Sequence, residues 1–400
     1  MNIRSLLHPK IYYLYQVKKL IRITTVPLSL EKLLENQPRF FSKHFDVTLV
    51  SSNKEKLEEI ANEQGVKYFP LEITRKITPL QDFRCLIQLV SFLRQENPYF
   101  VHSHTPKAGI IGMLAAYIAR VPIRMHTVAG LPLMEATGLK RILLNLVERI
   151  TYFCATNVYT NSKGLENFIN ENNFCDKSKL KTLGLGSSNG IDTAYFNPEE
   201  VSENQKANLK KELNIETTDF VFSFVGRLVG DKGINELIQA FVAVSKKYNS
   251  AKLILVGHTE AELDPLLPET LQSIELDENI IEVGFQKDIR PYLALTNVFT
   301  FPSYREGFPN AVLQANAMGI PCIVSDINGC NEIIKEGENG IIIPTKNSEI
   351  LQQKIELLLE KSNFFKASKA EIRKGISAKF ERQILWNLLL EEYRTLENNV

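Results

Sequence analysis

The chain has 400 residues, too many for one ordinary hydrophobic core, so two domains are expected. Its formal net charge of +1 excludes the strong basic field with which many proteins bind nucleic acid. Five cysteines without a CxxC spacing favour reduced thiols in a cytoplasmic protein and argue against a zinc site.

The sequence predicts neither a signal peptide nor a membrane-spanning helix. Its first 22 residues, "MNIRSLLHPKIYYLYQVKKLIR", have scattered charges, no clean apolar core and no small-residue cleavage site. The longest uncharged interior stretch with a helical pattern is "AGIIGMLAAYIA" at 108–119. As a helix it would extend about 18 Å, which is too short for a hydrocarbon core of about 30 Å.

Short β-rich segments alternate with helical patterns along the whole chain. The predicted strands are 20–26, 46–52, 66–71, 99–104, 123–128, 157–162, 179–184, 220–228, 251–257, 280–285, 297–303, 321–326 and 340–344. Such alternation is typical of parallel sheets covered by helices on both faces, and two such sets predict an α/β protein with two doubly wound, Rossmann-like domains.

Domain boundaries are expected at polar segments between these sets. We assign 1–200 to the first domain and 201–375 to the second, with the polar stretch 192–220 as the junction. Residues 376–400 belong to a last helix, predicted over about 365–398, that we expect to cross back to the first domain.

In open parallel sheets, ligands bind beyond the carboxyl ends of the strands. In the first half, "YFVHSHTPKAGIIG" places His104 at such an end, and "IRMHTVAG" does the same for His126. For each histidine the alternative is a ring that is satisfied by local backbone. His102 and His104 do not predict a zinc site, because no further ligands cluster with them.

The segment "GLKRILLNLVERI" at 138–150 has the apolar spacing of an amphipathic helix. Its apolar positions are Leu139, Ile142, Leu143, Leu146, Val147 and Ile150. One interpretation is a surface helix packed on the core through these residues. The alternative is contact with a membrane surface, which would suit an enzyme with a lipid-linked substrate.

The glycine-rich segment "GLGSSNGID" at 184–192 contains Asn189 and suggests a dinucleotide loop at first sight. Its glycines do not fit G-x-G-x-x-G, and no acidic residue closes a strand about 20 residues later as that fingerprint requires. A hydride-transferring Rossmann enzyme is therefore not expected.

The segment "FVGRLVGDKG" predicts an anion site. A buried strand ends at Gly226, Arg227 and Lys232 follow at its tip, and a helix then begins. Two cations beside a glycine-rich turn and a helix N-terminus suit phosphate oxygens. The Walker A pattern is absent, and the alternative is a solvated basic turn.

The segment "SYREGFPNAVLQANAMG" places the acid Glu306 after a strand and begins a helix near Pro309. Ala311, Gln314 and Ala315 share one stripe of that helix by their spacing. The helix N-terminus is a second anion-binding element at the same predicted sheet edge as Arg227.

Together these motifs resemble a known family. "VGRLVGDKG", "GFQKDIRPYLALTNVFTFPSYREGFPNAVLQANAMGIPCIVSD" and "NEIIKEGENGIIIP" are similar to the nucleotide-sugar half of the family 4 glycosyltransferases, which are retaining enzymes of the GT-B fold. "VHSHTPKAGIIGMLAAYIARVPIRMHTVAG" and "TNSKGLENFI…GSSNGID" resemble their acceptor half. "HTVAGLPLMEATGLKR" and "SDINGCNEII" resemble a bacterial subgroup that builds capsule, O-antigen or exopolysaccharide units.

The resemblance implies roles for individual residues. Arg227 and Lys232 would bind the donor diphosphate, and Glu306, the first acid of the family's E-x7-E motif, would face the hydroxyls of the donor sugar. The further donor-site residues implied are Gly226, Phe285, Lys287, Gly307, Phe308, Pro309 and Gln314. On the acceptor side, His126 would support the developing charge or orient the acceptor, and His104 and Asn189 would line the cleft.

Three departures from the family pattern stand out. Gln314 replaces the second acid of E-x7-E, which commonly holds ribose hydroxyls. Losing that charge should cost on the order of 1 kcal/mol, or several-fold in donor affinity. Many relatives read "TVHG", which would put histidine at Ala129 rather than His126. The N-terminal "GG" loop of many relatives is replaced by "TVPLSL" at 25–30.

We therefore expect a retaining glycosyltransferase that moves a sugar from a UDP-sugar to a saccharide on a polyprenyl diphosphate, in bacterial surface polysaccharide synthesis. No DxD-like metal pair follows a predicted strand, so no metal or other cofactor is expected. The expected location is cytoplasmic, with peripheral contact to the inner face of the membrane. The alternatives are a UDP-sugar epimerase of the same architecture and a catalytically weak binding subunit of an assembly complex.

Overall fold

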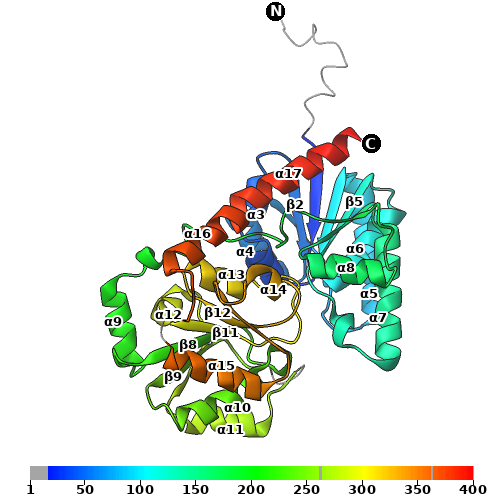
Figure 1. Cartoon of the computed structure of the whole chain (residues 1–400). Helices are drawn as coiled ribbons and strands as arrows, with labels where there is room; N and C mark the ends of the chain where they lie inside the picture. Colours follow the sequence, from blue (N-terminus) through cyan, green and yellow to red (C-terminus); the bar gives the residue numbers. More distant parts are fainter. Residues whose placement is uncertain (1–16, 261–263, 362–363, 400) are drawn as a thin grey trace, which may run out of the picture. The chain divides into compact units, whose positions relative to one another are not determined.

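The computed structural model describes residues 17–260, 264–361 and 364–399 (Figure 1). Its contacts divide the chain into two compact units. The first is Met1–Thr160, Glu166–Leu183 and Trp386–Val400, and the second is Asn161–Leu165 and Gly184–Leu385. Residues 1–16 of the N-terminal segment, in which the sequence predicts no signal peptide, lie outside the described residues. Within the described ranges, no helix is both long and apolar enough to cross a bilayer.

The first unit contains a seven-stranded parallel sheet in the order β3-β2-β1-β4-β5-β6-β7. The strands are β1 Lys19–Ile23, β2 Asp46–Ser51, β3 Lys67–Pro70, β4 Phe100–His104, β5 Ile123–Val128, β6 Asn157–Thr160 and β7 Leu180–Thr182. The helices are α2 Pro27–Leu33, α3 Gln37–Phe41, α4 Lys54–Gln64, α5 Pro79–Glu96, α6 Pro106–Ile118, η3 Pro132–Glu135, α7 Gly138–Cys154 and α8 Lys163–Glu171.

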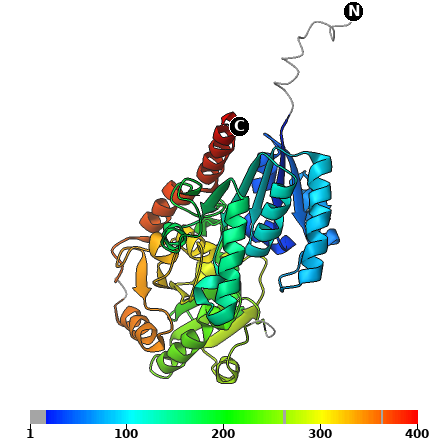
Figure 2. The same cartoon turned by 90° about the vertical axis from the view of Figure 1, so that its right-hand side faces the viewer.

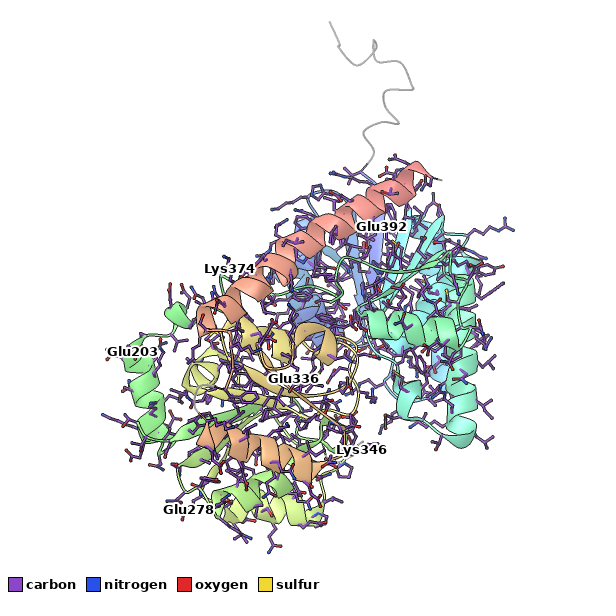
Figure 3. All side chains as sticks on the ribbon, in the orientation of Figure 1. Glu203, Glu278, Glu336, Lys346, Lys374 and Glu392 are labelled. Carbon is purple, nitrogen blue, oxygen red and sulfur yellow. The ribbon has the colours of Figure 1, made fainter. Side chains whose placement is uncertain are left out.

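The two faces of this sheet have different coverings. On one face, apolar residues of β1 and β4 pack with α3 and with the last helix, α17 Arg382–Asn398, through Phe41 and Tyr393. Glu392 of α17 accepts hydrogen bonds from Tyr159 (3.0 Å) and Lys181 (2.6 Å) and is labelled in Figure 3. On the other face, α6 packs on β4 and β5 and is flanked by α5 and α7 (Figure 2).

The second unit contains a six-stranded parallel sheet in the order β10-β9-β8-β11-β12-β13. The strands are β8 Phe220–Val225, β9 Ala251–Val256, β10 Ile280–Gly284, β11 Val298–Phe301, β12 Cys322–Ser325 and β13 Gly340–Ile343. The helices are η4 Pro198–Glu200, α9 Glu203–Glu212, η5 Gly230–Lys232, α10 Ile234–Ser245, α11 Pro268–Leu276, α12 Arg290–Leu295, α13 Asn310–Ala317, α14 Cys330–Ile333, α15 Ser348–Glu360 and α16 Lys369–Phe380.

Both sheets have helices on both faces, so the prediction of two doubly wound, Rossmann-like units is confirmed. In each sheet the strand order reverses beside the first strand, which creates a switch point where ligands bind in such folds. The reversal lies between β1 and β4 in the first unit and between β8 and β11 in the second.

The contacts divide the chain at different places from those we expected. The change of unit falls at Leu183/Gly184 rather than at 200/201, and the predicted junction 192–220 belongs to the second unit. There α9 packs on α12, which explains how a strongly polar segment forms an ordinary surface helix. The single last helix that we predicted is two helices, α16 and α17, separated by Glu381. The carboxylate of Glu381 accepts hydrogen bonds from Thr193.

Helix α7 contradicts the interpretation that its apolar stripe packs on the core. Leu139, Ile142, Leu146 and Phe153 have exposed fractions of 85%, 65%, 54% and 68%. The same helix instead buries Glu148, which is only 4% exposed. The spacing indicates an amphipathic helix correctly, but the buried face is the one that carries Glu148 and Tyr152, and the apolar stripe is exposed.

The burial of Glu148 has a consequence for stability. Burial raises the pKa of the Glu148 carboxyl from 4.5 to about 7. In the unfolded chain the group ionises near the lower value, so the folded state binds more protons between the two values. Stability should therefore fall as the pH rises from 4.5 to 7, by up to about 3 kcal/mol from this group.

Glu148→Gln should remove this dependence. We expect the free energy of unfolding of the variant, minus that of the natural chain, to increase by about 3 kcal/mol between pH 4.5 and pH 8. Urea denaturation at a series of pH values measures it. Glu171→Gln, at an exposed position of α8, is the control and should show no such trend. A pH-independent difference for Glu148→Gln would contradict the assignment.

Candidate functional site

The switch point of the second sheet brings together the charged residues that follow its central strands. Arg227 follows β8 and forms an ion pair with Glu260, which follows the neighbouring strand β9. The side chains of Arg227 and Glu260 are 34% and 18% exposed. Glu260 was not among the predicted site residues, although its place after a strand, in "GHTE", is the signal that would have found it.

Lys232 and Glu306 form the second ion pair of this edge. Lys232 ends η5 after β8, and Glu306 lies in the loop after β11, so the pair spans the switch point. Both side chains are 17% exposed. The hydroxyl of Ser303 lies 3.1 Å from Glu306 Oε1, and Lys232 Nζ lies 5.8 Å from the centroid of the Phe301 ring. The structure therefore brings the predicted cation and the predicted acid into direct contact.

The turn that carries Lys232 depends on one glycine. Gly233 has a φ of 70°, and a Cβ there would lie 2.1 Å from the carbonyl oxygen of Pro302. The close approach holds η5 against the loop after β11, and α10 begins directly after it. A side chain at this position would push Lys232 away from Glu306.

Further polar contacts brace the same turn. Asp231 pairs with Arg305 (2.8 Å), and its backbone N–H donates to Asp264 (2.7 Å). The Tyr304 hydroxyl donates to Glu236 (2.6 Å), and Lys346 Nζ lies 4.7 Å from the centroid of the Tyr304 ring. These contacts hold the loops after β8 and β11 together, and such preorganisation lowers the entropic cost of binding.

The residues Gly307, Phe308 and Pro309 form a buried connection from Glu306 to α13. The ring of Phe308 is 7% exposed and packs on Phe380 with their centroids 5.3 Å apart, so that side chain belongs to the core. Pro309 is the N-cap residue of α13. The donor-site role that the resemblance implies for these three residues stays a prediction.

Gln314 lies on α13, eight residues after Glu306. Its side chain is half-buried, and it makes no hydrogen bond with any other part of the chain that the structure describes. An amide in that position retains its full capacity to donate and accept. The ribose-binding role implied by the resemblance stays a prediction.

Phe285 and Lys287 follow the edge strand β10, separated from β8 by β9. The Phe285 side chain is 60% exposed, and its ring centroid lies 6.3 Å from that of His258. Lys287 is exposed. Gly226 follows β8 immediately. A Cβ on Gly257, which follows β9, would lie 1.7 Å from the carbonyl oxygen of Gly226, so the two backbones are closely packed at this part of the sheet edge.

In the first unit, His104 ends β4 at the switch point. Its Nε2 lies 2.8 Å from Nη2 of Arg22, a fully buried residue of β1. Burial, and then the nearby His102 and Arg22, hold the pKa of His104 well below its ordinary value. Because an arginine N–H can only donate, His104 Nε2 is the acceptor and Nδ1 carries the hydrogen. His104 is thus a neutral ring at pH 7.

His126 lies within β5 rather than beyond its end. Its Nδ1 is 2.8 Å from the Ser103 hydroxyl, and a Cβ on Gly109 of α6 would lie 2.5 Å from its ring. The ring is 2% exposed, and burial lowers its pKa to about 4. His126 faces α6, whereas His104 lies beside Arg22 and His102 on the face covered by α17. The two histidines therefore lie on opposite faces of the sheet. This geometry is that of a packed core histidine, and a catalytic role for His126 stays a prediction.

Asn189 is 4% exposed and belongs to the second unit. Its loop is fastened at Ile191, which exchanges backbone hydrogen bonds with Phe380 (2.8 Å) and Arg382 (3.0 Å). Asn189 is therefore not placed in the first unit, where we expected the acceptor side.

In the described ranges no group of three His, Cys, Asp or Glu side chains is arranged to hold a metal ion.

Comparison with protein families gives two matches. Residues 205–375 match the family described as "Glycosyl transferases group 1", and residues 33–162 match "Glycosyl transferase 4-like". The first match covers the strands and loops that form the ion pairs Arg227–Glu260 and Lys232–Glu306. The second covers β2 to β6 of the first unit.

The chain is similar to named glycosyltransferases. The chain is 34% identical to the capsular polysaccharide biosynthesis glycosyltransferase CapM of Staphylococcus aureus, covering 94% of this chain and 97% of CapM. It is 28% identical to the UDP-Gal:α-D-GlcNAc-diphosphoundecaprenol α-1,3-galactosyltransferase of Escherichia coli, covering 84% of each. Among solved structures, Anabaena HepE in complex with UDP and glucose superposes with a TM-score of 0.79 at 17% identity, covering 94% of this chain and 100% of HepE.

Proposed function

Because this chain belongs to the group 1 glycosyltransferases of family 4, we propose that it transfers a sugar from a UDP-sugar to a saccharide on a polyprenyl diphosphate, with retention at the anomeric carbon. The observation that carries the proposal is the meeting of Lys232 and Glu306 at the switch point of the second sheet. There the two side chains are in direct contact. Lys232 would bind phosphate, and Glu306 would accept hydrogen bonds from sugar hydroxyls.

The donor would bind by exchange of ion-pair partners. In the structure, Arg227 contacts Glu260 and Lys232 contacts Glu306. When a diphosphate enters, its oxygens would replace these carboxylates as partners of the two cations. Charge-assisted bonds of this kind are stronger than neutral ones. Glu306 would then be free to accept hydrogen bonds from hydroxyls of the sugar.

The transfer step needs stabilisation of the leaving diphosphate. The bond from the anomeric carbon to the phosphate oxygen breaks with its electron pair on that oxygen. The acceptor oxygen forms its new bond on the same face of the sugar, and its proton passes to the departing diphosphate. Arg227 and Lys232 would oppose the negative charge that develops, and fixed charge of this kind is usually the largest catalytic contribution.

The lipid-linked acceptor is supported by the relatives. The E. coli protein acts on a diphosphoundecaprenol-linked sugar, and a Campylobacter jejuni relative that is 28% identical is named for the same kind of acceptor. Such an acceptor would bring the enzyme to the inner face of the cytoplasmic membrane.

The direct test incubates the purified chain with a set of UDP-sugars and lipid-linked monosaccharide acceptors. We expect a disaccharide product whose anomeric configuration, read from proton couplings, matches that of the donor. An inverted product would refute retention. Conversion of a UDP-sugar without an acceptor would favour the epimerase alternative, and UDP binding without any turnover would favour a binding subunit.

Gln314→Glu should preserve transfer and improve the affinity for the donor. Restoring a charged acceptor at a ribose-facing position is worth about 1 kcal/mol, or about fivefold in the Kd of UDP. Calorimetry with UDP measures this change. Gln352→Glu, on the surface helix α15, is the control. A UDP affinity unchanged by Gln314→Glu would show that this side chain does not face the nucleotide.

A further inference from the structure

The first unit has an apolar strip that continues across three neighbouring helices. On α7, exposed apolar side chains recur at the spacing of one helical face, at Leu139, Ile142, Leu143, Leu146, Ile150 and Phe153. The strip continues to α6, where the ring of Tyr117 lies 5.9 Å from that of Phe153, measured between centroids. The next residue of α6, Ile118, lines a hollow of about 500 Å³ with Phe83 and Ile87 of α5.

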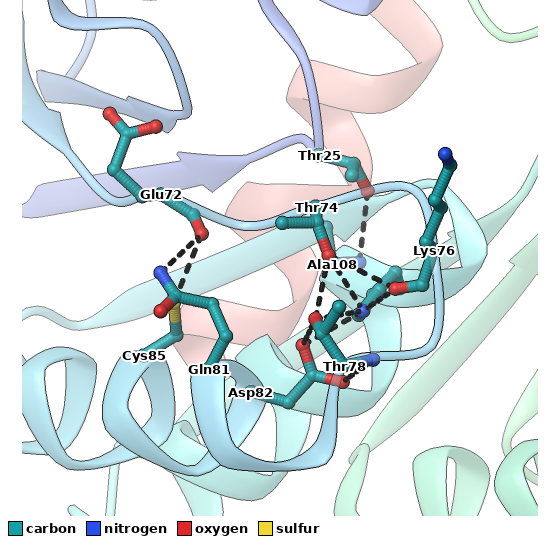
Figure 4. Close-up of polar contacts among 10 residues, drawn as sticks. Thr25, Glu72, Thr74, Lys76, Thr78, Gln81, Asp82, Cys85 and Ala108 are labelled. Atoms are coloured by element: carbon teal, nitrogen blue, oxygen red, sulfur yellow. Dashed lines mark hydrogen bonds and ion pairs between the residues drawn. The ribbon is translucent and has the colours of Figure 1, made fainter.

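Few soluble surfaces are so apolar without a partner. Single exposed apolar residues are ordinary, but a contiguous patch over several helices marks an interaction site. The strip also continues beyond the start of α5, where Leu80 is 82% exposed and Ile77, in the preceding loop, is 68% exposed. That loop is held by hydrogen bonds among Thr74, Lys76 and Thr78 and the first turn of α6 (Figure 4).

The exposed charged side chains of α5, α6 and α7 have one sign. In α5, α6 and α7, which the structure describes in full, the acidic residues are Asp82, Glu96 and Glu148. Asp82 and Glu96 are ion-paired with Lys107 and Lys19, and Glu148 is buried. The exposed cations, by contrast, line both outer helices, at Arg84, Arg94, Lys140 and Arg149.

We propose that this strip, formed by the outer faces of α5 and α7 with the end of α6, docks on an anionic lipid bilayer. Apolar side chains that enter the headgroup region with cations beside them are the recognised design of an interfacial helix. A second copy of the chain fits less well, because a two-fold contact through this face would set the same cations against each other. This docking proposal rests on the proposed function only for the reason why the protein would bind a membrane, which is that a lipid-linked acceptor lies in a bilayer.

Sedimentation with vesicles tests the docking. The full chain should sediment with vesicles of phosphatidylcholine and phosphatidylglycerol, and much less with phosphatidylcholine alone or at high salt. Leu143→Ser with Leu146→Ser, and separately Lys140→Glu with Arg149→Glu, should each weaken the partition about tenfold or more. Leu276→Ser on α11 and Lys211→Glu with Lys246→Glu are the matched exposed controls in the second unit and should have no effect.

A fluorescent probe reports insertion directly. The chain has one tryptophan, so Leu146→Trp in a Trp386→Phe background provides a single probe on the strip. Its emission should shift to shorter wavelength on anionic vesicles, and that of Leu276→Trp in the same background should not. Vesicle binding that is unchanged in both strip variants would overturn the proposal. So would a dimer in solution that the Leu143 and Leu146 substitutions disperse.

The test separates this proposal from the enzymatic one. Transfer to a water-soluble acceptor with a short lipid tail, combined with no vesicle binding, would remove the docking surface and leave the function. Vesicle binding that the strip variants abolish, in a chain that neither binds UDP nor transfers sugar, would remove the function and leave the surface.

Discussion

Lys232→Ala and Arg227→Ala should each lower the rate of sugar transfer about a hundred- to a thousandfold. Each cation would lie against the leaving diphosphate, where negative charge increases most in the transition state. Each substitution should also weaken UDP binding, because a charge-assisted contact to the diphosphate is lost. Radiolabelled transfer assays and UDP calorimetry on the same preparations measure both effects.

The control must separate lost chemistry from lost folding. Lys232→Ala leaves Glu306 without its cation, and both side chains are only 17% exposed, so some loss of stability is expected. Lys247→Ala removes a lysine of the same unit that pairs with Glu356 (3.4 Å) at the surface, and it should retain full activity. Full transfer by both Lys232→Ala and Arg227→Ala, in well-folded protein, would refute the assignment of the diphosphate site.

Glu306→Ala should lower transfer about a hundredfold while leaving the Kd of UDP unchanged within about threefold. The carboxylate would hold sugar hydroxyls, which UDP lacks, and its removal frees Lys232 for phosphate. Glu306→Ala should therefore differ from Lys232→Ala, which weakens UDP binding. Glu306→Gln, which keeps an acceptor oxygen without the charge, should give an intermediate rate.

Two observations check this interpretation of Glu306. Glu356→Ala breaks the surface ion pair with Lys247 and serves as the matched acidic control. If Glu306→Ala weakened UDP binding as strongly as Lys232→Ala does, the acid would act only by positioning the lysine. A transfer rate equal to that of the natural chain would remove Glu306 from the site.

The fold could be predicted well from the sequence because its two signals, the apolar runs of the strands and the helical patterns between them, are both local. Strands buried on both faces read as short apolar runs, and all thirteen predicted segments contain or overlap a strand of the structure. Their parallel pairing follows from the helices between them. The residues after β8 and β11 could therefore be nominated, and Arg227, Lys232 and Glu306 do lie at one sheet edge.

Contacts between distant segments were beyond the sequence. The position of Glu260 after β9 could have nominated it as a site residue. It is 33 residues from Arg227, however, and nothing in the spacing of residues says that the two side chains pair. His126 was nominated because "IRMHTVAG" looks like a strand end, yet β5 continues two residues past it and α6 covers its ring. The contacts divide the chain at a different residue from the expected boundary, because α9 is polar in sequence and joins the second unit through packing on α12.

Helix α7 shows most clearly where local information ends. Its spacing determined that Leu139, Ile142, Leu143 and Leu146 share one face, because helical periodicity is a property of the chain itself. Which face turns outward was decided by tertiary packing: α7 packs on α6 and η3, and it buries Glu148 and Tyr152 while its apolar side chains stay exposed. Periodicity fixes the direction of a side chain only relative to its own helix axis, and the rotation of that axis against the sheet depends on residues far away in the sequence.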